Sequence, residues 1–483
     1  MKREYDGTMV GKVIFGKRGF LGMVAVSLFA AALLLCLSSC VGGRGNVSQS
    51  SRVELGESFS ESGDAEVPAY WWEEFDDGEL DLLMERALSE NLELRAAWKR
   101  LDEARAVASR EGSGLWPSAD ASGSAARSVR RSEPVTGGEI ETRSSNQFQV
   151  GLTVSYVVDI WGKIRAGRDS ARLAAEASAQ DVRATELALS AQVAGAWYRL
   201  CEQYGQLELL AEQVESSEKT LELVEMRFRK GQVSATDVLR QRELLESVRT
   251  ERAGVESAAA SLRHQLAVLT GQVPAQVDLP RRAKLPGLPR RPDTGSPRRW
   301  VQHRPDIQSA YHRLLSLDRS VAVALADRYP AFRLNAEGES AVPTLSDLLE
   351  QWAVSLGGSV AAPIFSGGRR EAEVDRARAA LAEAVEQYGQ AILEGVREVE
   401  DALSAESAQK RTIAGLERQL ELAGRTLEQL RERYRNGTVA FIEVLEAEQS
   451  VQSLQRRLLE ARRNLIERRI DLYAALGGGE IKP

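Results

Sequence analysis

Two long stretches of the chain carry apolar residues at alternating steps of three and four. The positions that follow this spacing are Leu207, Leu210, Val214, Ser217, Leu221, Val224 and Phe228, and then Leu416, Leu420, Ala423, Leu427, Leu430 and Tyr434. A sustained period of 3.5 residues predicts helices that pack as coiled coils. Residues 165–230 contain no proline, so the first helix can run for roughly 66 residues, or about 100 Å. Gly231 and Gly437 follow the two stretches and are predicted to end them with positive φ.

Other segments alternate with a period of two, which predicts β-strands. The clearest runs place apolar side chains at Phe148, Val150, Leu152, Val154 and Tyr156, and at Trp352, Val354, Leu356 and Val360. Each run is close to the roughly 9–11 residues with which a tilted strand crosses a bilayer. Residues 332–336 alternate briefly, and residues 119–130 hardly at all. Trp116, Trp161 and Phe365 flank the strands, as an interfacial aromatic belt requires, although a half-buried sheet of a soluble protein is the alternative.

The chain also repeats itself. Residues 227–239 and 433–445 are identical at six of 13 positions, at an offset of 206, and upstream the offset becomes 213. The sequence therefore predicts an internal duplication, with a first repeat at 69–271, a second at 301–479 and a C-terminal tail at 480–483. Six of the 14 prolines fall within 272–300, which predicts a linker between the repeats.

Four strands per chain cannot form a closed structure in a membrane. An open sheet edge leaves backbone groups unpaired in lipid at several kcal/mol each, and the smallest barrels use about eight strands. The chains must therefore associate. Two copies provide eight strands and three provide twelve, and only the larger barrel leaves an obvious water-filled lumen. The predicted fold class is an α+β membrane protein whose strands form a shared transmembrane β-barrel, continued below the membrane by the long helices.

The N-terminus resembles a secretion signal. Residues 20–37 are apolar and follow Lys12, Lys17 and Arg18, which is typical of a cleaved signal peptide. The segment Leu37-Ser38-Ser39-Cys40 is similar to the bacterial lipobox, in which the cysteine is acylated. We therefore expect a lipoprotein signal at 1–39, lipidation of Cys40 and an N-terminal flexible tether at 40–68. An uncleaved anchor is the alternative, and translation from Met9 is a second possible start.

Composition excludes several functions. The chain is 43% hydrophobic and 28% charged, with a formal net charge of −7, which argues against a disordered chain and against a nucleic-acid binder. Three histidines and three cysteines, with no ligand spacing, predict neither a metal site nor a cofactor. Ser216 and Lys219 have the S-x-x-K spacing but lie in a predicted helix, and the acids Glu398, Glu400 and Asp401 are best explained as structural. We predict no catalytic residues and no enzyme activity.

Several short motifs together resemble one protein family. They are Trp71-Trp72 with Phe75, and the segments 156–163 (YVVDIWGK), 303–307 (HRPDI), 363–368 (PIFSGG), 398–403 (EVEDAL) and 472–479 (LYAALGGG). In this order, over about 400 residues, they resemble the outer membrane factor family of TolC-like and OprM-like exit ducts, and most closely its NodT-type lipoproteins. The resemblance implies a homotrimer with a 12-stranded β-barrel and a twelve-helix periplasmic tunnel. It also implies a periplasmic adaptor protein and an inner-membrane pump of the RND or ABC type.

The same resemblance implies where the functional site lies. In the family, the turns after the long helices form the periplasmic tip and contact the adaptor, which here selects Gly231 and Gly437. Acidic residues beyond the second turn narrow the pore, which selects Glu443 and Glu446 with Ile442 beside them, and Asp237 in the first repeat. A solvated helix face is the alternative for these acids.

The predicted function is therefore the outer-membrane channel of a tripartite efflux system, anchored in the cell outer membrane and extending into the periplasm. The alternatives are an exit duct for type I protein secretion and a non-conducting coiled-coil lipoprotein. A passive conduit exports what its pump supplies, so the sequence does not identify the substrate.

Overall fold

Helices of equal length recur at the offsets found in the sequence. The computed structural model describes residues 53–132, 141–276 and 278–478. The paired helices are α3 (Leu92–Ser113) with α7 (Pro305–Ala326), α4 (Lys163–Arg229) with α8 (Arg369–Arg435), and α5 (Ala235–Leu269) with α9 (Phe441–Ala475). The first pair has 22 residues each, the second 67 and the third 35. The starts of α4 and α8 differ by 369 − 163 = 206 residues, so the duplicated helices are confirmed, together with the predicted long helix.

The strands form one antiparallel sheet with the order β1-β2-β3-β4. Their bounds are Ser118–Ser132, Glu141–Val158, Ala331–Val342 and Ala353–Ala361. All four predicted strands are therefore present, and each repeat contributes one pair. β1 and β2 are longer than the alternation predicts. Their pairing continues from Ala126–Gln147 to Ser132–Glu141, whereas β3 pairs only with residues 148–158 of β2.

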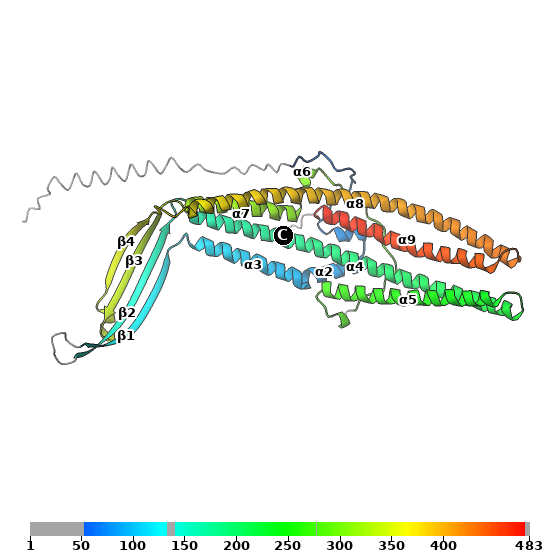
Figure 1. The fold of residues 1–483 in the computed structure, drawn as a ribbon, viewed down its shortest axis with the longest axis horizontal. Helices are drawn as coiled ribbons and strands as arrows, with labels where there is room; N and C mark the ends of the chain where they lie inside the picture. The colour runs from blue at the N-terminus through cyan, green and yellow to red at the C-terminus, as the bar shows by residue number, and fades with distance from the viewer. Residues whose placement is uncertain (1–52, 133–140, 277, 479–483) are drawn as a thin grey trace, which may run out of the picture. The chain divides into compact units, whose positions relative to one another are not determined.

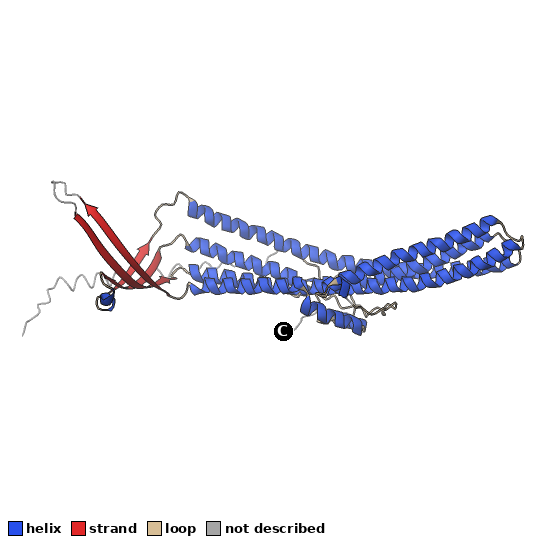
Figure 2. Cartoon of the chain, turned by 90° about the horizontal axis from the view of Figure 1, so that it is seen from below, coloured by secondary structure: helices blue, strands red, loops and turns tan. Residues whose placement is uncertain are grey.

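The helices are arranged around α4. α3 and α7 pack along the N-terminal part of α4, which is nearer the sheet, while α5 and α9 pack along its C-terminal part. The two hairpins α4–α5 and α8–α9 end next to each other, at the opposite end of α4 and α8 from the sheet (Figures 1 and 2). We call the turns of these two hairpins the tips. Among the described residues, no helix combines the length and apolar character needed to cross a membrane.

The largest apolar core surrounds the middle of α4. Trp197 and Tyr198 are fully buried there, together with residues of the short helix η1 (Trp71–Phe75) and of α2 (Gly78–Glu90). Trp71 stacks on Tyr473 of α9, with ring centroids 5.4 Å apart. Segments from both ends of the chain therefore close this core. The remaining short helices are η2 (Pro274–Gln276), α6 (Pro297–Trp300) and η3 (Leu345–Leu349).

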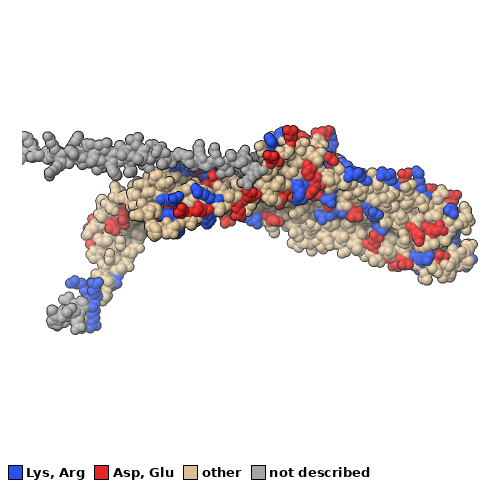
Figure 3. Space-filling view, turned by 45° about the horizontal axis from the view of Figure 1, so that its top comes forward, with Lys and Arg blue, Asp and Glu red and all other residues tan. Residues whose placement is uncertain are grey.

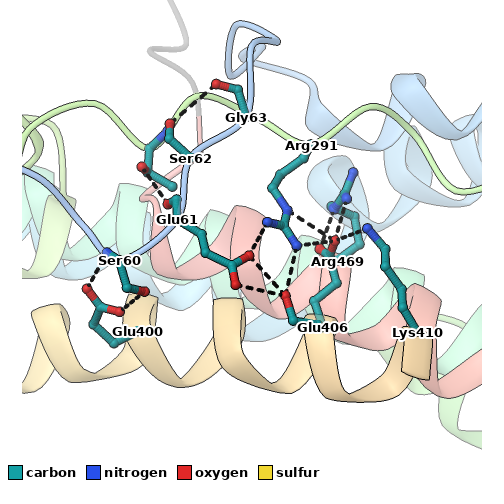
Figure 4. A network of polar contacts seen from close by, with 11 residues as sticks. Ser60, Glu61, Ser62, Gly63, Arg291, Glu400, Glu406, Lys410 and Arg469 are labelled. Carbon is teal, nitrogen blue, oxygen red and sulfur yellow. Dashed lines mark hydrogen bonds and ion pairs between the residues drawn. The ribbon is translucent and has the colours of Figure 1, made fainter. Parts of the chain in front are cut away.

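The described part of the predicted tether is docked on the helices, which differs from the flexible segment expected from its composition. The backbone of Gly63 and Ala65 donates to the carbonyl oxygens of Pro292 and Arg291 at 3.0 and 3.2 Å. Ser60 donates its backbone N–H to Glu400 of α8 at 3.0 Å (Figure 4). We call residues 53–65 the strap. A segment rich in serine and glutamate is predicted from composition alone to be flexible. In this structure those side chains pair with groups of α8 and of the central linker.

A buried charge cluster holds the linker and strap to α8 and α9. The Glu406 carboxylate is fully buried and accepts two 2.9 Å hydrogen bonds from the guanidinium of Arg469. Lys410 and Arg291 contact the same carboxylate at 2.8 and 3.1 Å, and Arg291 also pairs with Glu61 of the strap (Figure 4). Burial alone raises the pKa of Glu406, but these cationic donors outweigh it and lower that pKa to about 2. Glu406 is therefore ionised at neutral pH.

Candidate functional site

The register of the sheet places its apolar side chains on one face. In an antiparallel sheet, directly paired residues point to the same side, and successive residues point to opposite sides. Val154 of β2 is paired with Ala119 and Ala336, and Ala336 with Leu356. The neighbouring rows contain Leu152 with Val354, Phe148 with Val342, and Val158 with Phe332 and Val360. Much of this face is open: Leu356 is 82% exposed and Val354 63%.

The opposite face of the sheet is polar. Asp120 of β1 is paired with Thr153, and Thr153 with Glu337 of β3. The adjacent row contains Glu339. A sheet with an open apolar face and an open acidic face differs from the half-buried soluble sheet, in which one face packs against a core. Both outer edges, on β1 and β4, have no partner strand among the described residues.

Each long helix ends at its tip in the same backbone motif. Gly231 has φ of 70° and Gly437 has φ of 73°, and the positive φ predicted for both is confirmed. After the first helix, Gln232 donates to the carbonyl of Arg227 at 2.9 Å, and after the second, Thr438 donates to Arg433 at 3.0 Å. This six-residue closure is a Schellman cap, which requires a left-handed residue that glycine adopts without strain.

The predicted pore acids follow these caps at the start of α5 and α9. The Asp237 carboxylate accepts from the backbone N–H and the hydroxyl of Ser234, at 3.0 and 2.8 Å, and completes a capping box. In the second repeat Glu443 accepts from the backbone N–H of Ala440 at 3.3 Å, but an alanine has no oxygen to return the bond. Glu443 and Glu446 are exposed. Among the described residues, the three acids are not paired with one another.

The two tips are joined by apolar and aromatic contacts. Phe441 and Leu445 of α9 are buried against Val238 and Val224 of the first hairpin, with Ile442 half-buried beside them. The guanidinium of Arg227 lies over the ring of Tyr434, 4.9 Å from its centroid. The structure thus places Ile442 against an apolar cluster to which both hairpins contribute, and leaves Glu446 exposed.

Buried polar residues near the tips were not identified from the sequence. Glu448 is only 4% exposed, accepts from Ser216 at 3.3 Å and pairs with Arg431 at 3.4 Å. The signal for it was present, because Phe441, Leu445, Glu448 and Gln452 keep the three–four spacing of a coiled-coil seam. A polar residue at such a position is predicted to be buried, not solvated.

The other candidate groups serve structural contacts. Ser216 faces Glu448, while Lys219 pairs with Glu215 at 2.6 Å. Glu398 pairs with Arg304, and Asp401 with Arg397 at 2.7 Å. The described residues contain no cluster of His, Cys, Asp and Glu able to hold a metal ion. Cys40, the predicted lipidation site, lies outside the described residues.

Comparison with known proteins gives consistent matches. Residues 83–272 and 297–478 match the family described as outer membrane efflux protein. The chain is 31% identical over 421 residues to the pyoverdine export outer membrane protein OpmQ of Pseudomonas aeruginosa, covering 86% of this chain and 88% of OpmQ. It is 28% identical over 475 residues to nodulation protein T of Rhizobium leguminosarum, covering 95% of each. The solved structure of the outer membrane protein VceC of Vibrio cholerae aligns with a TM-score of 0.77 at 28% identity, covering 86% of this chain and 99% of that one.

Proposed function

Because the chain belongs to the outer membrane efflux protein family, we propose that it is the exit channel of a tripartite efflux system. Three copies form a 12-stranded barrel in the outer membrane, and their helices continue it as a periplasmic tunnel. A periplasmic adaptor and an inner-membrane pump deliver small molecules to the tips, and the channel conducts them passively to the exterior. The repeat boundaries at 69–271 and 301–479, separated by the linker, are part of this proposal.

The observation that carries the proposal is the open apolar face of a sheet whose two edges are unpaired among the described residues. A contiguous exposed apolar surface of this kind marks contact with lipid or with another chain. In lipid, unpaired strand edges are too costly to persist, so β1 of one copy pairs with β4 of the next. With four strands per chain, three copies place the acidic face, with Asp120, Glu337 and Glu339, around a lumen.

At the other end, the proposed gate is formed by the acids of the tips. Glu443 and Glu446 from three copies supply six carboxylates around the narrow end, with Ile442 beside them and Asp237 in the first repeat. Like charges close together repel unless cations screen them, so the ring favours cations. The turns at Gly231 and Gly437 are the outermost part of each tip, and there the adaptor binds and separates the hairpins.

The position of the strap supports a lipid anchor at Cys40. Val53 lies beside Gly389 of α8, 20 residues from the start of that helix, or about 30 Å along it. Later strap residues contact α8 progressively farther from the sheet, at Glu400 and Ser407. The thirteen steps from Cys40 to Val53 can span at most about 45 Å. An acyl group on Cys40 can therefore reach a membrane at the level of the sheet.

Single-channel recording in planar bilayers tests the proposal. The wild-type protein should run as a heat-sensitive trimer and conduct with cation selectivity. Glu446→Gln should weaken that selectivity and the block by multivalent cations, because it removes three charges from the ring. Glu460→Gln is the matched control, since Glu460 is an exposed acid of the same helix, far from the tip. A monomer without conductance would reject the channel, whereas unchanged selectivity in Glu446→Gln would reject only the gate.

A further inference from the structure

Basic residues gather on the part of the sheet that extends beyond β3 and β4. Residues 126–132 of β1 pair with residues 141–147 of β2, and β3 does not reach this part of β2. This two-stranded ribbon carries Arg127, Arg130, Arg131 and Arg143. All four are exposed. Figure 3 shows basic atoms concentrated at this end of the sheet, next to the segment drawn in grey.

The alternation along the strands divides these arginines between the two faces. Phe148 is paired with Ala125 on the apolar face, and every second residue of β1 from Ala125 points to the same side. Arg127 and Arg131 therefore continue the apolar face. Arg130 is paired directly with Arg143, and both point to the polar face.

On this face Arg127 follows Ala125, and Val129, which is 64% exposed, lies between Arg127 and Arg131. At about 3.4 Å per residue, Arg127 lies about 7 Å beyond Ala125 along the strand, and Arg131 about 20 Å beyond it. Among the residues with described side chains, neither has a hydrogen bond or ion pair to an acid. The acids nearest in sequence, Glu133, Glu139 and Glu141, lie outside that part of the chain. The described apolar face thus continues onto the ribbon as Arg127, Val129 and Arg131, and the two arginines have no counter-charge among the described side chains.

We propose that Arg127 and Arg131 bind the phosphate groups of a phosphorylated glycolipid in the outer leaflet of the membrane. This inference rests on the proposed function, because that function places the ribbon at the outer side, away from the periplasmic helices. Guanidinium groups bind phosphate oxygens with paired, charge-assisted hydrogen bonds. The adjoining apolar face contacts the acyl chains of the same molecule. This continuity favours a lipid over a free phosphate ion.

The test measures lipid binding to the delipidated full-length protein in detergent by native mass spectrometry. The probes are diphosphoryl lipid A, the same lipid without phosphates, and inorganic pyrophosphate. The test variant is Arg127→Gln/Arg131→Gln, and the matched control is Arg130→Gln/Arg143→Gln, which removes the same charge from the same ribbon on the other face. A basic group near an anionic surface is worth about fivefold in affinity, so the test variant should bind diphosphoryl lipid A about thirtyfold more weakly. The control should stay within about twofold of wild type.

Three results would overturn the proposal: equal losses in both variants, equal binding of the two lipids by the wild type, or full competition by pyrophosphate. Each would show that Arg127 and Arg131 do not form a site for a lipid phosphate. Conductance of the same preparations in planar bilayers is recorded in parallel. If the wild type conducts but its lipid binding is unchanged by the substitution of Arg127 and Arg131, only this inference is rejected. If the wild type does not conduct, the proposed function is rejected.

Discussion

Replacing Glu406 by glutamine should destabilise the chain without changing its shape. Glutamine has nearly the same volume but is neutral, and its NH₂ group faces the donors of Arg469 in place of an acceptor. Removing one partner of a buried ion pair costs about 3–5 kcal/mol because the remaining charge stays buried. The lowered pKa gives an independent magnitude: a fall from 4.5 to about 2 corresponds to about 3 kcal/mol, at 1.36 kcal/mol per pKa unit.

The assay is thermal unfolding followed by circular dichroism of the helices in detergent. Unfolding entropy is about 2.1 cal/mol/K per residue, or about 0.9 kcal/mol/K for about 430 residues. A loss of about 3 kcal/mol then lowers the melting temperature by about 3 °C if the chain unfolds cooperatively. Asp401→Asn is the matched control on the same helix, because Asp401 is exposed and, within the described part of the chain, forms its ion pair with Arg397. An exposed pair of this spacing is worth about 0.3–0.5 kcal/mol.

The pH dependence provides a second check with a defined sign. The pKa of Glu406 is lower in the folded chain than in the unfolded chain, so the unfolded state binds more protons between about pH 2 and pH 4.5. The stabilisation is complete above pH 4.5 and is lost as the pH falls toward 2. The difference in melting temperature between wild type and Glu406→Gln should therefore narrow over this range. Equal melting temperatures for Glu406→Gln and Asp401→Asn at neutral pH would refute the reasoning.

Three further substitutions or reactions test other parts of the structure. Gly437→Ala should lower the melting temperature, since a φ of 73° costs an alanine about 1–2 kcal/mol. Gly415→Ala is the control: Gly415 lies within α8 with open space around it, so alanine should raise the melting temperature through its higher helix propensity. Shifts of the same sign in the two variants would contradict this reasoning. Asp77→Ala should be among the most damaging changes in a melting experiment, because its buried carboxylate caps α2 and also accepts from a tryptophan and an arginine; a shift below 1 °C would be too small for these losses. Burial raises the pKa of Cys201 to about 12, so a thiol reagent at pH 8 should label it only after unfolding, and rapid labelling of the native protein would show that this core opens.

The helices could be predicted closely because their signal is local. The three–four spacing and the absence of proline predicted residues 165–230, and the helix spans 163–229. The same spacing over residues 416–434, together with the duplication, located α8. The strands were predicted in position but not in length. Residues 141–147 of β2 are polar and do not alternate, so no periodicity marked them as part of a strand.

The strap and its charge cluster could not be predicted because the partners are far apart in sequence. Arg469 lies 63 residues from Glu406, and Arg291 lies 115 residues from it. Glu406 keeps the three–four spacing of the buried Val399 and Leu403, which predicts that it is buried, but this spacing does not identify the cations that pair with it. The strap has a composition typical of a flexible segment, and only contact with the linker and α8 orders it. The predicted pore acids depend on a resemblance for their role, since the structure gives their caps but not a pore.

The polarity of the interior changes along α4, and this change is relevant to how a gate at the tips can open. Around Trp197 and Tyr198 the core is apolar and closed by aromatic rings. Farther toward the tip, Gln213 and Ser216 of α4 face polar groups of α9, including Arg456 at 2.7 Å and Glu448 at 3.3 Å. Separating apolar surfaces exposes them to water at full cost, whereas polar groups exchange their partners for water at a small net cost. Moving α9 away from α4 therefore costs least along this polar stretch, whereas a gate at the tips must also separate Phe441 and Leu445 from the apolar residues of the first hairpin.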